Sequence, residues 1–316
     1  MCGIVGYVGH RKAQPILLNG LKRLEYRGYD SAGIALLTGT GLFVSKAAGK
    51  ISQLIQSIGG MENGSTIGIA HTRWATHGEP NQINAHPHTD ANCEIALVHN
   101  GIIENYRTLK EFLVKQDYAI KTDTDTEILV HLIHYNYNGD LTEAVRSALT
   151  QVEGTYGIAV VSAKHPGTLV AARMGSPLVI GHGENENFIA SDVSAMLEHT
   201  NRVVYLEDGE IATVTSDDYH ITTIERDRIT PRVQEINWTL DQMEKSGFDH
   251  FMLKEVHEQP NVIRRILDEY VGADDLVDLK DLGLSASELA RTSRIVIQAC
   301  GTSWHAGLSG KRLLEG

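Results

Sequence analysis

The sequence has few cysteines, no long hydrophobic run and no excess of positive charge. Its three cysteines among 316 residues, Cys2, Cys93 and Cys300, are far apart and odd in number, which predicts neither a disulfide framework nor a zinc site. No stretch approaches the roughly 18 apolar residues of a transmembrane helix, and no basic segment with a long apolar run opens the chain. We therefore expect a cytoplasmic protein without a membrane partner, a metal or a cofactor.

The charge balance is acidic. There are 28 Lys and Arg residues against 40 Asp and Glu residues, a net charge of −12, which argues against a nucleic-acid-binding surface although a local basic patch stays open. The 15 histidines, including His86 and His88, lack the carboxylate or cysteine neighbours of a metal site. We interpret them mostly as surface or packing residues.

The hydrophobic pattern predicts many short strands interrupted by a block of helices. A strand at 2–8 is followed by a helix at 13–24 whose apolar residues share one face. Further strands are expected at 33–38, 42–46, 67–72, 94–99, 157–163, 168–173, 178–181, 187–190, 202–206, 210–214 and 219–223, and helices at 105–116, 125–136 and 141–151. This order favours an α+β layered domain over a parallel βαβ array.

The pattern changes near Pro231. Residues 241–260 are expected to form an amphipathic helix with a connector, and helical periodicity returns at 261–270 and 285–291. Residues 294–299 then predict an apolar strand that runs into a small-residue turn and a helix near Trp304. Such a unit would stop after one βα step, and a lone strand cannot make a sheet. We therefore expect the chain to be the front part of a longer protein.

Cys2 is the first candidate catalytic residue. Removal of Met1 would leave one residue that carries both a thiol and a free α-amine, with pKa values of about 8.5 and about 8. The amine could then take the thiol proton and release a thiolate that attacks carbonyl carbons. Small residues at Gly3 and Gly6 leave the thiol uncrowded. The alternative is an ordinary buried cysteine at the start of a strand. Because Met1 would block the amine, we expect a chain that still carries Met1 to be an unprocessed precursor.

Asn100 and Gly101 follow the strand expected at 95–99. A side-chain amide and a glycine N–H can both point at one oxygen, so the pair is a candidate oxyanion site. The alternative is a hairpin turn, for which Asn-Gly is a common sequence.

Two polar segments complete a candidate substrate pocket. In the segment 71–78, the Arg73 guanidinium can bind a carboxylate through two hydrogen bonds. Trp74 in the same segment is expected either to pack against another group or to act as a gate. An aspartate within 122–127 could face an ammonium group. The alternatives are a solvated loop for 71–78 and a helix N-cap for 122–127. Together the residues fit an α-amino acid with a hydrolysable side-chain amide; glutamine fits best, but asparagine stays open.

The longest motifs resemble the glutaminase domain of class II amidotransferases, which are N-terminal nucleophile hydrolases. They are Met-Cys-Gly-Ile-Val-Gly at 1–6, Leu-Glu-Tyr-Arg-Gly-Tyr-Asp-Ser-Ala-Gly at 24–33, His-Thr-Arg-Trp-Ala-Thr-His-Gly at 71–78, His-Asn-Gly-Ile-Ile-Glu-Asn at 99–105 and Thr-Asp-Thr-Glu at 124–127. The segment 241–260 and Ala-Cys-Gly-Thr-Ser at 299–303 resemble the linker and first sugar-phosphate loop of the isomerising glutamine:fructose-6-phosphate aminotransferase family.

The resemblance implies a role for each matching residue. Cys2 would form a thioester with glutamine, and Asn100 and Gly101 would make the oxyanion hole. The remaining implied roles are α-carboxylate binding by Arg73, Thr76 and His77, α-amine binding by Asp125, positions beside the nucleophile for Arg27 and Gly28, and an ammonia gate at Trp74. The implied fold is a four-layer αββα sandwich of two antiparallel sheets, followed by a helical linker and the first βα step of a doubly wound α/β sugar isomerase domain.

The resemblance also divides the chain into a glutaminase domain at 2–240, a linker at 241–292 and the start of a sugar isomerase domain at 293–316. Thr302 and Ser303 stand where a helix N-terminus would favour the phosphate of fructose 6-phosphate, although a plain N-cap is the alternative. Family members are about twice as long. We therefore expect this chain to hydrolyse glutamine without making glucosamine 6-phosphate, and the full-length protein to be a homodimer.

Two rival functions are less consistent with these residues. Phosphoribosyl-pyrophosphate-dependent or asparagine-forming transferases would need other acceptor motifs than Cys300-Gly301-Thr302-Ser303. A non-enzymatic regulatory or sugar-phosphate-binding module would not need Cys2, Arg73, Asn100 and Asp125 together. We therefore expect an enzyme.

Overall fold

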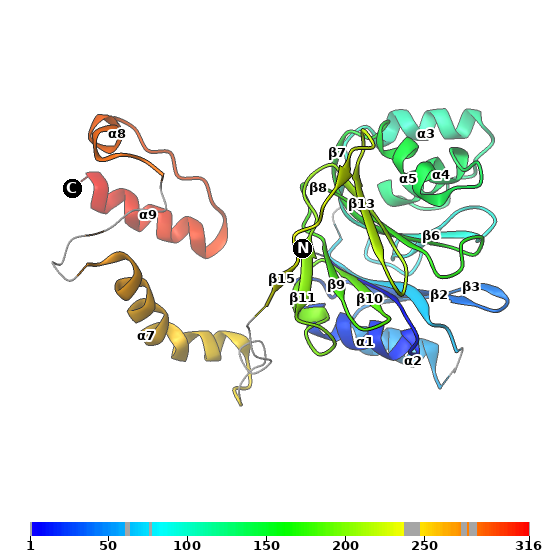
Figure 1. Ribbon diagram of the computed structural model, residues 1–316, viewed down its shortest axis with the longest axis horizontal. Coiled ribbons are helices and arrows are strands. Elements are labelled where there is room, and N and C mark those ends of the chain that lie inside the picture. The colour runs from blue at the N-terminus through cyan, green and yellow to red at the C-terminus, as the bar shows by residue number, and fades with distance from the viewer. Residues whose placement is uncertain are drawn as a thin grey trace. The chain divides into compact units, whose positions relative to one another are not determined.

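The chain folds into two units, Met1–Glu244 and Lys245–Gly316 (Figure 1). The structure, a computed structural model, describes residues 2–60, 64–75, 78–236, 247–272, 277 and 283–315. The first unit contains two antiparallel sheets and the helices that cover them.

The first sheet runs in the order β15-β11-β9-β10-β1-β4-β2-β3 within the described residues. Its strands are β1 (Gly3–Val8), β2 (Ser31–Thr38), β3 (Gly41–Ala48), β4 (Ile67–Arg73), β9 (Val179–His182), β10 (Asn187–Ala190), β11 (Arg202–Tyr205) and β15 (Gln234–Glu235). Helices α1 (Ala13–Leu24) and α2 (Ile51–Ile58) pack on its outer face (Figure 1). Helix α1 also contacts the short 3₁₀ helices η1 (Glu25–Arg27) and η2 (Val193–Ala195).

The second sheet runs in the order β14-β13-β12-β8-β7-β6-β5 among the described residues. Its strands are β5 (His88–Thr89), β6 (Ile95–Ile103), β7 (Gly154–Ser162), β8 (Leu169–Met174), β12 (Glu210–Val214), β13 (Tyr219–Thr223) and β14 (Arg228–Ile229). Helices α3 (Tyr106–Lys115), α4 (Asp125–Tyr135) and α5 (Leu141–Leu149) cover its outer face (Figure 1).

Alternation along the strands assigns each side chain to one of two cores. In β1, Val5 and Tyr7 pack into the core shared with α1, whereas Ile4 and Val8 pack into the core between the two sheets. This follows from the period of two in a strand, which sends successive side chains to opposite faces. The expected αββα sandwich is therefore confirmed.

The expected elements of the first unit lie close to the observed ones, with informative exceptions. The helix at 13–24 has the expected bounds, whereas α2 was missed because it is short and begins at one of three β-branched isoleucines. Its buried Ile51, Leu54 and Ile58 show that packing stabilises it.

Strand β6 continues four residues past its expected end at His99 because Asn100 and Gly101 pair with β7. The hairpin-turn alternative for Asn100–Gly101 is therefore wrong.

The second unit contains three helices within its described residues. Helix α7 (Phe251–Tyr270) runs through Pro260, so the expected connector before 261 is not formed; residues 237–246 lie outside the described part of the chain. Helix α8 (Ala286–Arg291) begins with a capping box in which the side chains of Ser285 and Glu288 bind each other's backbone N–H. Helix α9 is Gly301–Glu315.

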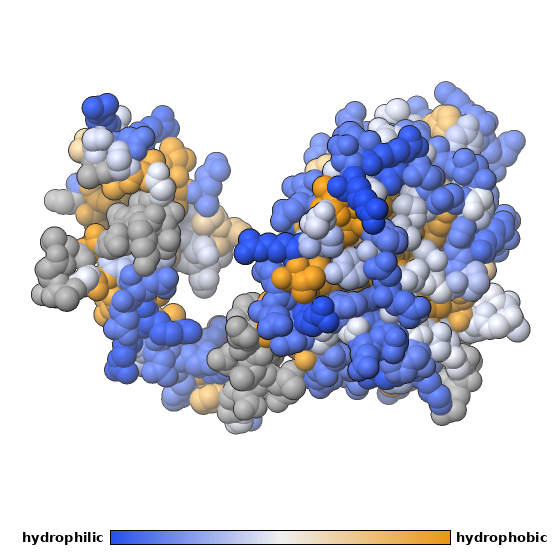
Figure 2. All heavy atoms as spheres, in the orientation of Figure 1, coloured by the Kyte–Doolittle hydropathy of each residue, from blue (hydrophilic) through white to orange (hydrophobic). Residues whose placement is uncertain are grey.

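The strand expected at 294–299 is not formed, and neither is the βα step that depends on it. Residues 292–300 contain no strand, because strand geometry is stable only when the backbone pairs and no described residue pairs with this segment. Ile295 and Val296 are exposed, and Figure 2 shows hydrophobic surface in this part of the second unit.

Candidate active site

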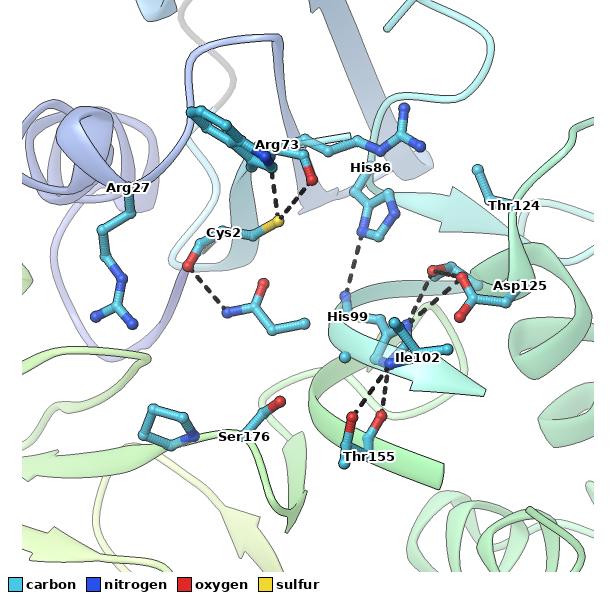
Figure 3. Close-up of a pocket in the computed structure, with 15 residues that line it drawn as sticks. Cys2, Arg27, Arg73, His86, His99, Ile102, Thr124, Asp125, Thr155 and Ser176 are labelled. Carbon is cyan, nitrogen blue, oxygen red and sulfur yellow. Dashed lines mark hydrogen bonds and ion pairs between the residues drawn. The ribbon is translucent and has the colours of Figure 1, made fainter. Parts of the chain in front are cut away.

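Seven of the residues expected at the site line one cavity of about 310 Å³ (Figure 3). They are Cys2, Arg27, Arg73, Trp74, Asn100, Gly101 and Asp125. Figure 3 shows Cys2 and Asp125 on opposite sides of this space, contributed by segments that lie far apart in the sequence. Sequence reasoning missed other lining residues, among them His86, His99, Thr155 and Ser176.

Strand alternation explains why the two sheets contribute different groups. Cys2 continues the even-numbered series of Ile4 and Val8, which face the opposite sheet. In β6, Ala96 and Val98 face the first sheet, so Asn100 does so too. The nucleophile and the amide therefore meet at one end of the core between the sheets.

The thiol of Cys2 lies against the backbone of Trp74. The Trp74 N–H donates to Cys2 Sγ at 3.1 Å, and the thiol donates to the Trp74 carbonyl at 3.5 Å. Burial raises the pKa of the Cys2 thiol, while the Trp74 N–H and the Arg73 charge oppose that rise. The thiol is therefore mostly protonated at neutral pH, and its reaction with a carbonyl requires a base.

Asn100 and Gly101 occupy the position of a candidate oxyanion site. The Asn100 amide donates from Nδ2 to the Cys2 carbonyl oxygen at 3.2 Å. Gly101 has a φ of 137°, and an added Cβ would lie 2.1 Å from the Thr155 carbonyl oxygen. Only glycine fits this backbone conformation and this close approach.

Arg73 and Asp125 place opposite charges in the cavity. Arg73 is 4% exposed, and its Nη1 donates to the Glu79 carbonyl at 3.3 Å. Burial lowers the pKa of Arg73, an effect that the Cys2 and Asp125 charges oppose. Asp125 is 5% exposed and accepts the Ile103 N–H at 2.9 Å. The N-cap interpretation of this segment is also correct, because the neighbouring Thr124 side chain caps α4.

Arg27 and Gly28 are placed differently relative to the cavity. Arg27 lines the cavity and pairs with Asp192 at 3.1 Å. Gly28 does not line the cavity, but an added Cβ would lie 2.7 Å from the carbonyl carbon of Arg73. Glycine at this position therefore lets the backbone that holds the Trp74 N–H approach closely.

The remaining expected site residues have other placements. Thr76 and His77 lie outside the described residues. The Trp74 side chain is 46% exposed and packs edge-on against Tyr29, with 5.6 Å between ring centroids. Thr302 and Ser303 lie in the first turn of α9, in the second unit.

Several histidines are buried around the cavity, where they are packing residues and not surface residues. His71 and His86 stack with 4.3 Å between ring centroids, and the His99 N–H donates to His86 Nδ1 at 3.3 Å. His99 also contacts Thr126 Oγ1 at 3.0 Å. The period of two along β4 could have placed His71 on the inner face, since Ile67 and Ile69 lie there.

A possible metal-ligand cluster elsewhere in the described residues is already engaged in other contacts. Asp90, Glu94 and His134 have ligand atoms within 4.8 Å of one another. However, Asp90 accepts the backbone N–H of Glu94 at 2.8 Å, and Glu94 pairs with Lys164 at 2.6 Å. The carboxylates of Asp90 and Glu94 therefore already have hydrogen-bond and ion-pair partners within the protein. None of the described helices is long and apolar enough to cross a membrane.

Buried His71 predicts a loss of stability in acid. Burial lowers its pKa to about 3, whereas an unfolded histidine titrates near about 6.5. The unfolded chain therefore takes up a proton that folded His71 does not, so its contribution is complete above about pH 6.5 and decreases as the pH falls towards 3. At about pH 5 the expected loss from His71 alone is roughly 2 kcal/mol.

The free energy of unfolding can be measured at about pH 7.5 and about pH 5 from denaturant unfolding, with hydrogen exchange of the β4 amides as the probe. The matched variant is His71→Gln, which should lose less stability across the same interval. An equal loss in both proteins would contradict the assignment.

The sandwich of two antiparallel sheets, with Cys2 beside the Asn100 amide, defines a glutamine amidotransferase fold of the N-terminal nucleophile class. The chain belongs to the glutamine amidotransferase domain family, whose family model matches residues 57–238.

The curated relatives and a solved structure are consistent with this assignment. The chain is 52% identical over 322 residues to "Glutamine--fructose-6-phosphate aminotransferase [isomerizing]" of Chlorobaculum tepidum, covering 100% of the chain and 52% of the relative. The protein of that name from Symbiobacterium thermophilum is 48% identical over 316 residues, with the same coverage of 100% and 52%. The chain therefore spans about half the length of the curated relatives it matches.

The chain is also similar to a solved structure. The glutamine phosphoribosylpyrophosphate amidotransferase of B. subtilis, complexed with ADP and GMP, is 27% identical with a TM-score of 0.63, covering 71% of this chain and 49% of that one.

Proposed function

We propose that this chain hydrolyses glutamine to glutamate and ammonia with Cys2 as the nucleophile. The observation that carries the proposal is the convergence of the Cys2 thiol, the Asn100 amide and the Arg73 and Asp125 charges on one cavity. A thiol and an amide donor suit acyl transfer. The paired charges suit the carboxylate and ammonium groups of an amino acid.

The reaction begins when Cys2 Sγ attacks the side-chain carbonyl carbon of glutamine. The thiol proton moves to the free α-amine that remains on Cys2 after Met1 is removed, and the developing oxyanion accepts hydrogen bonds from the Asn100 amide and the Gly101 N–H. The C–N bond then breaks, ammonia leaves with that proton, and a thioester remains. Water hydrolyses the thioester, which releases glutamate and restores the thiol. The raised pKa of Cys2 supports the requirement for a base.

Substrate recognition follows from the two charges. The Arg73 guanidinium holds the α-carboxylate together with Thr76 and His77, and Asp125 holds the α-ammonium group. Arg27 and Gly28 support the nucleophile segment. We prefer glutamine over asparagine because the relatives are named for glutamine.

For a protein that contains both halves of the curated relatives, we propose that the ammonia is transferred to fructose 6-phosphate to give glucosamine 6-phosphate. The printed names of those relatives support this acceptor. The corresponding assignment places a glutaminase domain at 2–240, a linker at 241–292 and the start of a sugar isomerase domain at 293–316, with Thr302 and Ser303 as phosphate ligands. Trp74 gates the ammonia route, and the protein works as a cytoplasmic homodimer.

The direct test is glutamate release from glutamine by the purified chain, with mass spectrometry of its N-terminus. We expect release from glutamine, much slower release of aspartate from asparagine, and activity only in molecules that begin at Cys2. Inserting a lysine between Met1 and Cys2 provides the matched control, because a large residue after Met1 prevents its removal and leaves no amine on Cys2. A chain that begins at Cys2 and releases no glutamate would overturn the proposal.

A further inference from the structure

A hydrogen bond joins the two sheets directly behind the nucleophile. His71 Nε2 lies 2.9 Å from Asn100 Oδ1. His71 belongs to β4 in the first sheet and Asn100 to β6 in the second, and 29 residues separate them. Apolar side chains such as Ile69 and Val98 form most of the described core between the sheets. This polar contact therefore connects the oxyanion amide to the strand that lies beside β1.

The chemistry of the neighbouring groups determines which way the Asn100 amide faces. A carbonyl oxygen can only accept a hydrogen bond, so the group facing the Cys2 carbonyl at 3.2 Å must be the Asn100 NH₂. The amide oxygen then faces His71, which must donate from Nε2. Because a neutral imidazole carries one N–H, His71 Nδ1 is left as a bare acceptor.

The surroundings of His71 agree with this tautomer. His71 is 0% exposed, and its Nδ1 has no hydrogen-bond partner in the described part of the structure. Leaving a buried polar atom unpaired costs free energy, so the single ring hydrogen is committed to Asn100. The ring also stacks on His86, which accepts the His99 N–H and is itself held in place.

We propose that His71 is a positioning residue that holds the Asn100 amide with its NH₂ turned towards the reacting carbonyl oxygen. This inference rests on the proposed glutaminase function and deepens it. Without the His71 donor, a half-turn of the amide would present its oxygen to the developing oxyanion and replace attraction by repulsion. Preorganised donors contribute to catalysis only if they face the charge before it develops.

The test compares His71→Phe, which keeps a ring in the stack but removes the donor, with His71→Gln, whose side-chain amide can donate from a similar position. For glutamate release we expect kcat of His71→Phe to fall by about 10- to 100-fold with KM within about 2-fold, and His71→Gln to recover most of the loss. The matched control is His131→Phe, because His131 is also buried, but its ring lies beside Glu127 and not beside Asn100.

A second readout separates positioning from damage to the fold. Alkylation of Cys2 by iodoacetamide forms no oxyanion, so its rate should be unchanged in His71→Phe. A wild-type kcat in His71→Phe, or a parallel loss of kcat and alkylation in both His71 variants, would overturn the inference.

The Asn100 side-chain amide can also be followed by ¹⁵N NMR, with its signal assigned by its disappearance in Asn100→Ala. We expect a distinct, slowly exchanging pair of signals in the wild type and in His71→Gln, and averaged or fast-exchanging signals in His71→Phe. This measurement decides the positioning role even if the wild type releases no glutamate, a result that would count against the proposed function alone. Unchanged amide signals in His71→Phe would contradict the positioning role.

Discussion

Replacing Cys2 by alanine is expected to lower glutamate release by at least about 10⁴-fold, because it removes the atom that forms the thioester. Cys2 Sγ accepts the Trp74 N–H, and the Cys2 carbonyl oxygen accepts the Asn100 amide N–H. Neither of the other two cysteines lines the cavity. The measurement is steady-state glutamate release, with confirmation by mass spectrometry that the variant has lost Met1 and begins at the substituted alanine.

The chain offers two matched controls for this substitution. Cys93 and Cys300 are free and exposed and do not line the cavity, so Cys93→Ala and Cys300→Ala should release glutamate at the wild-type rate. Iodoacetamide should inactivate both control variants as fast as the wild type. Substantial activity in Cys2→Ala, or inactivity in either control, would contradict the assignment of Cys2.

Replacing Asn100 by alanine is expected to lower kcat by about 10²- to 10³-fold, or roughly 3 to 4 kcal/mol, with little change in KM. The amide interacts with an oxygen whose charge develops only in the transition state, so its loss should not weaken glutamine binding. Arg73 and Asp125, which are proposed to bind the substrate, remain in place. Initial rates over a range of glutamine concentrations separate the two parameters.

The matched control for Asn100→Ala is Asn201→Ala, because Asn201 is exposed and outside the cavity. Its kinetic parameters should equal those of the wild type. A rise in KM with unchanged kcat in Asn100→Ala would assign Asn100 to substrate binding and contradict its role as an oxyanion donor.

Local patterns in the sequence were enough to predict an α+β layered domain, and the resemblance to class II amidotransferases added the two antiparallel sheets. Together they predicted seven of the 15 residues that line the cavity. Short apolar runs between turns predict strands that can be buried on both faces, as in β1, whose alternate side chains pack into two different cores. Helix α1 was predicted with its observed bounds because its apolar residues repeat at helical spacing. Cys2 could be chosen because the combination of a thiol and an α-amine is local to one residue.

The way in which the catalytic groups meet depends on tertiary contacts that no local pattern specifies. The Asn-Gly pair has the local sequence of a turn, but pairing with β7 extends β6 through it and aims Asn100 at Cys2. The hydrogen bond from His71 to Asn100 joins two separate sheets. Likewise, residues 294–299 have a strand-like composition but form no strand without a partner. Local sequence sets the conformational preference and the face of each residue, whereas pairing and cross-sheet contacts depend on residues far apart in the chain.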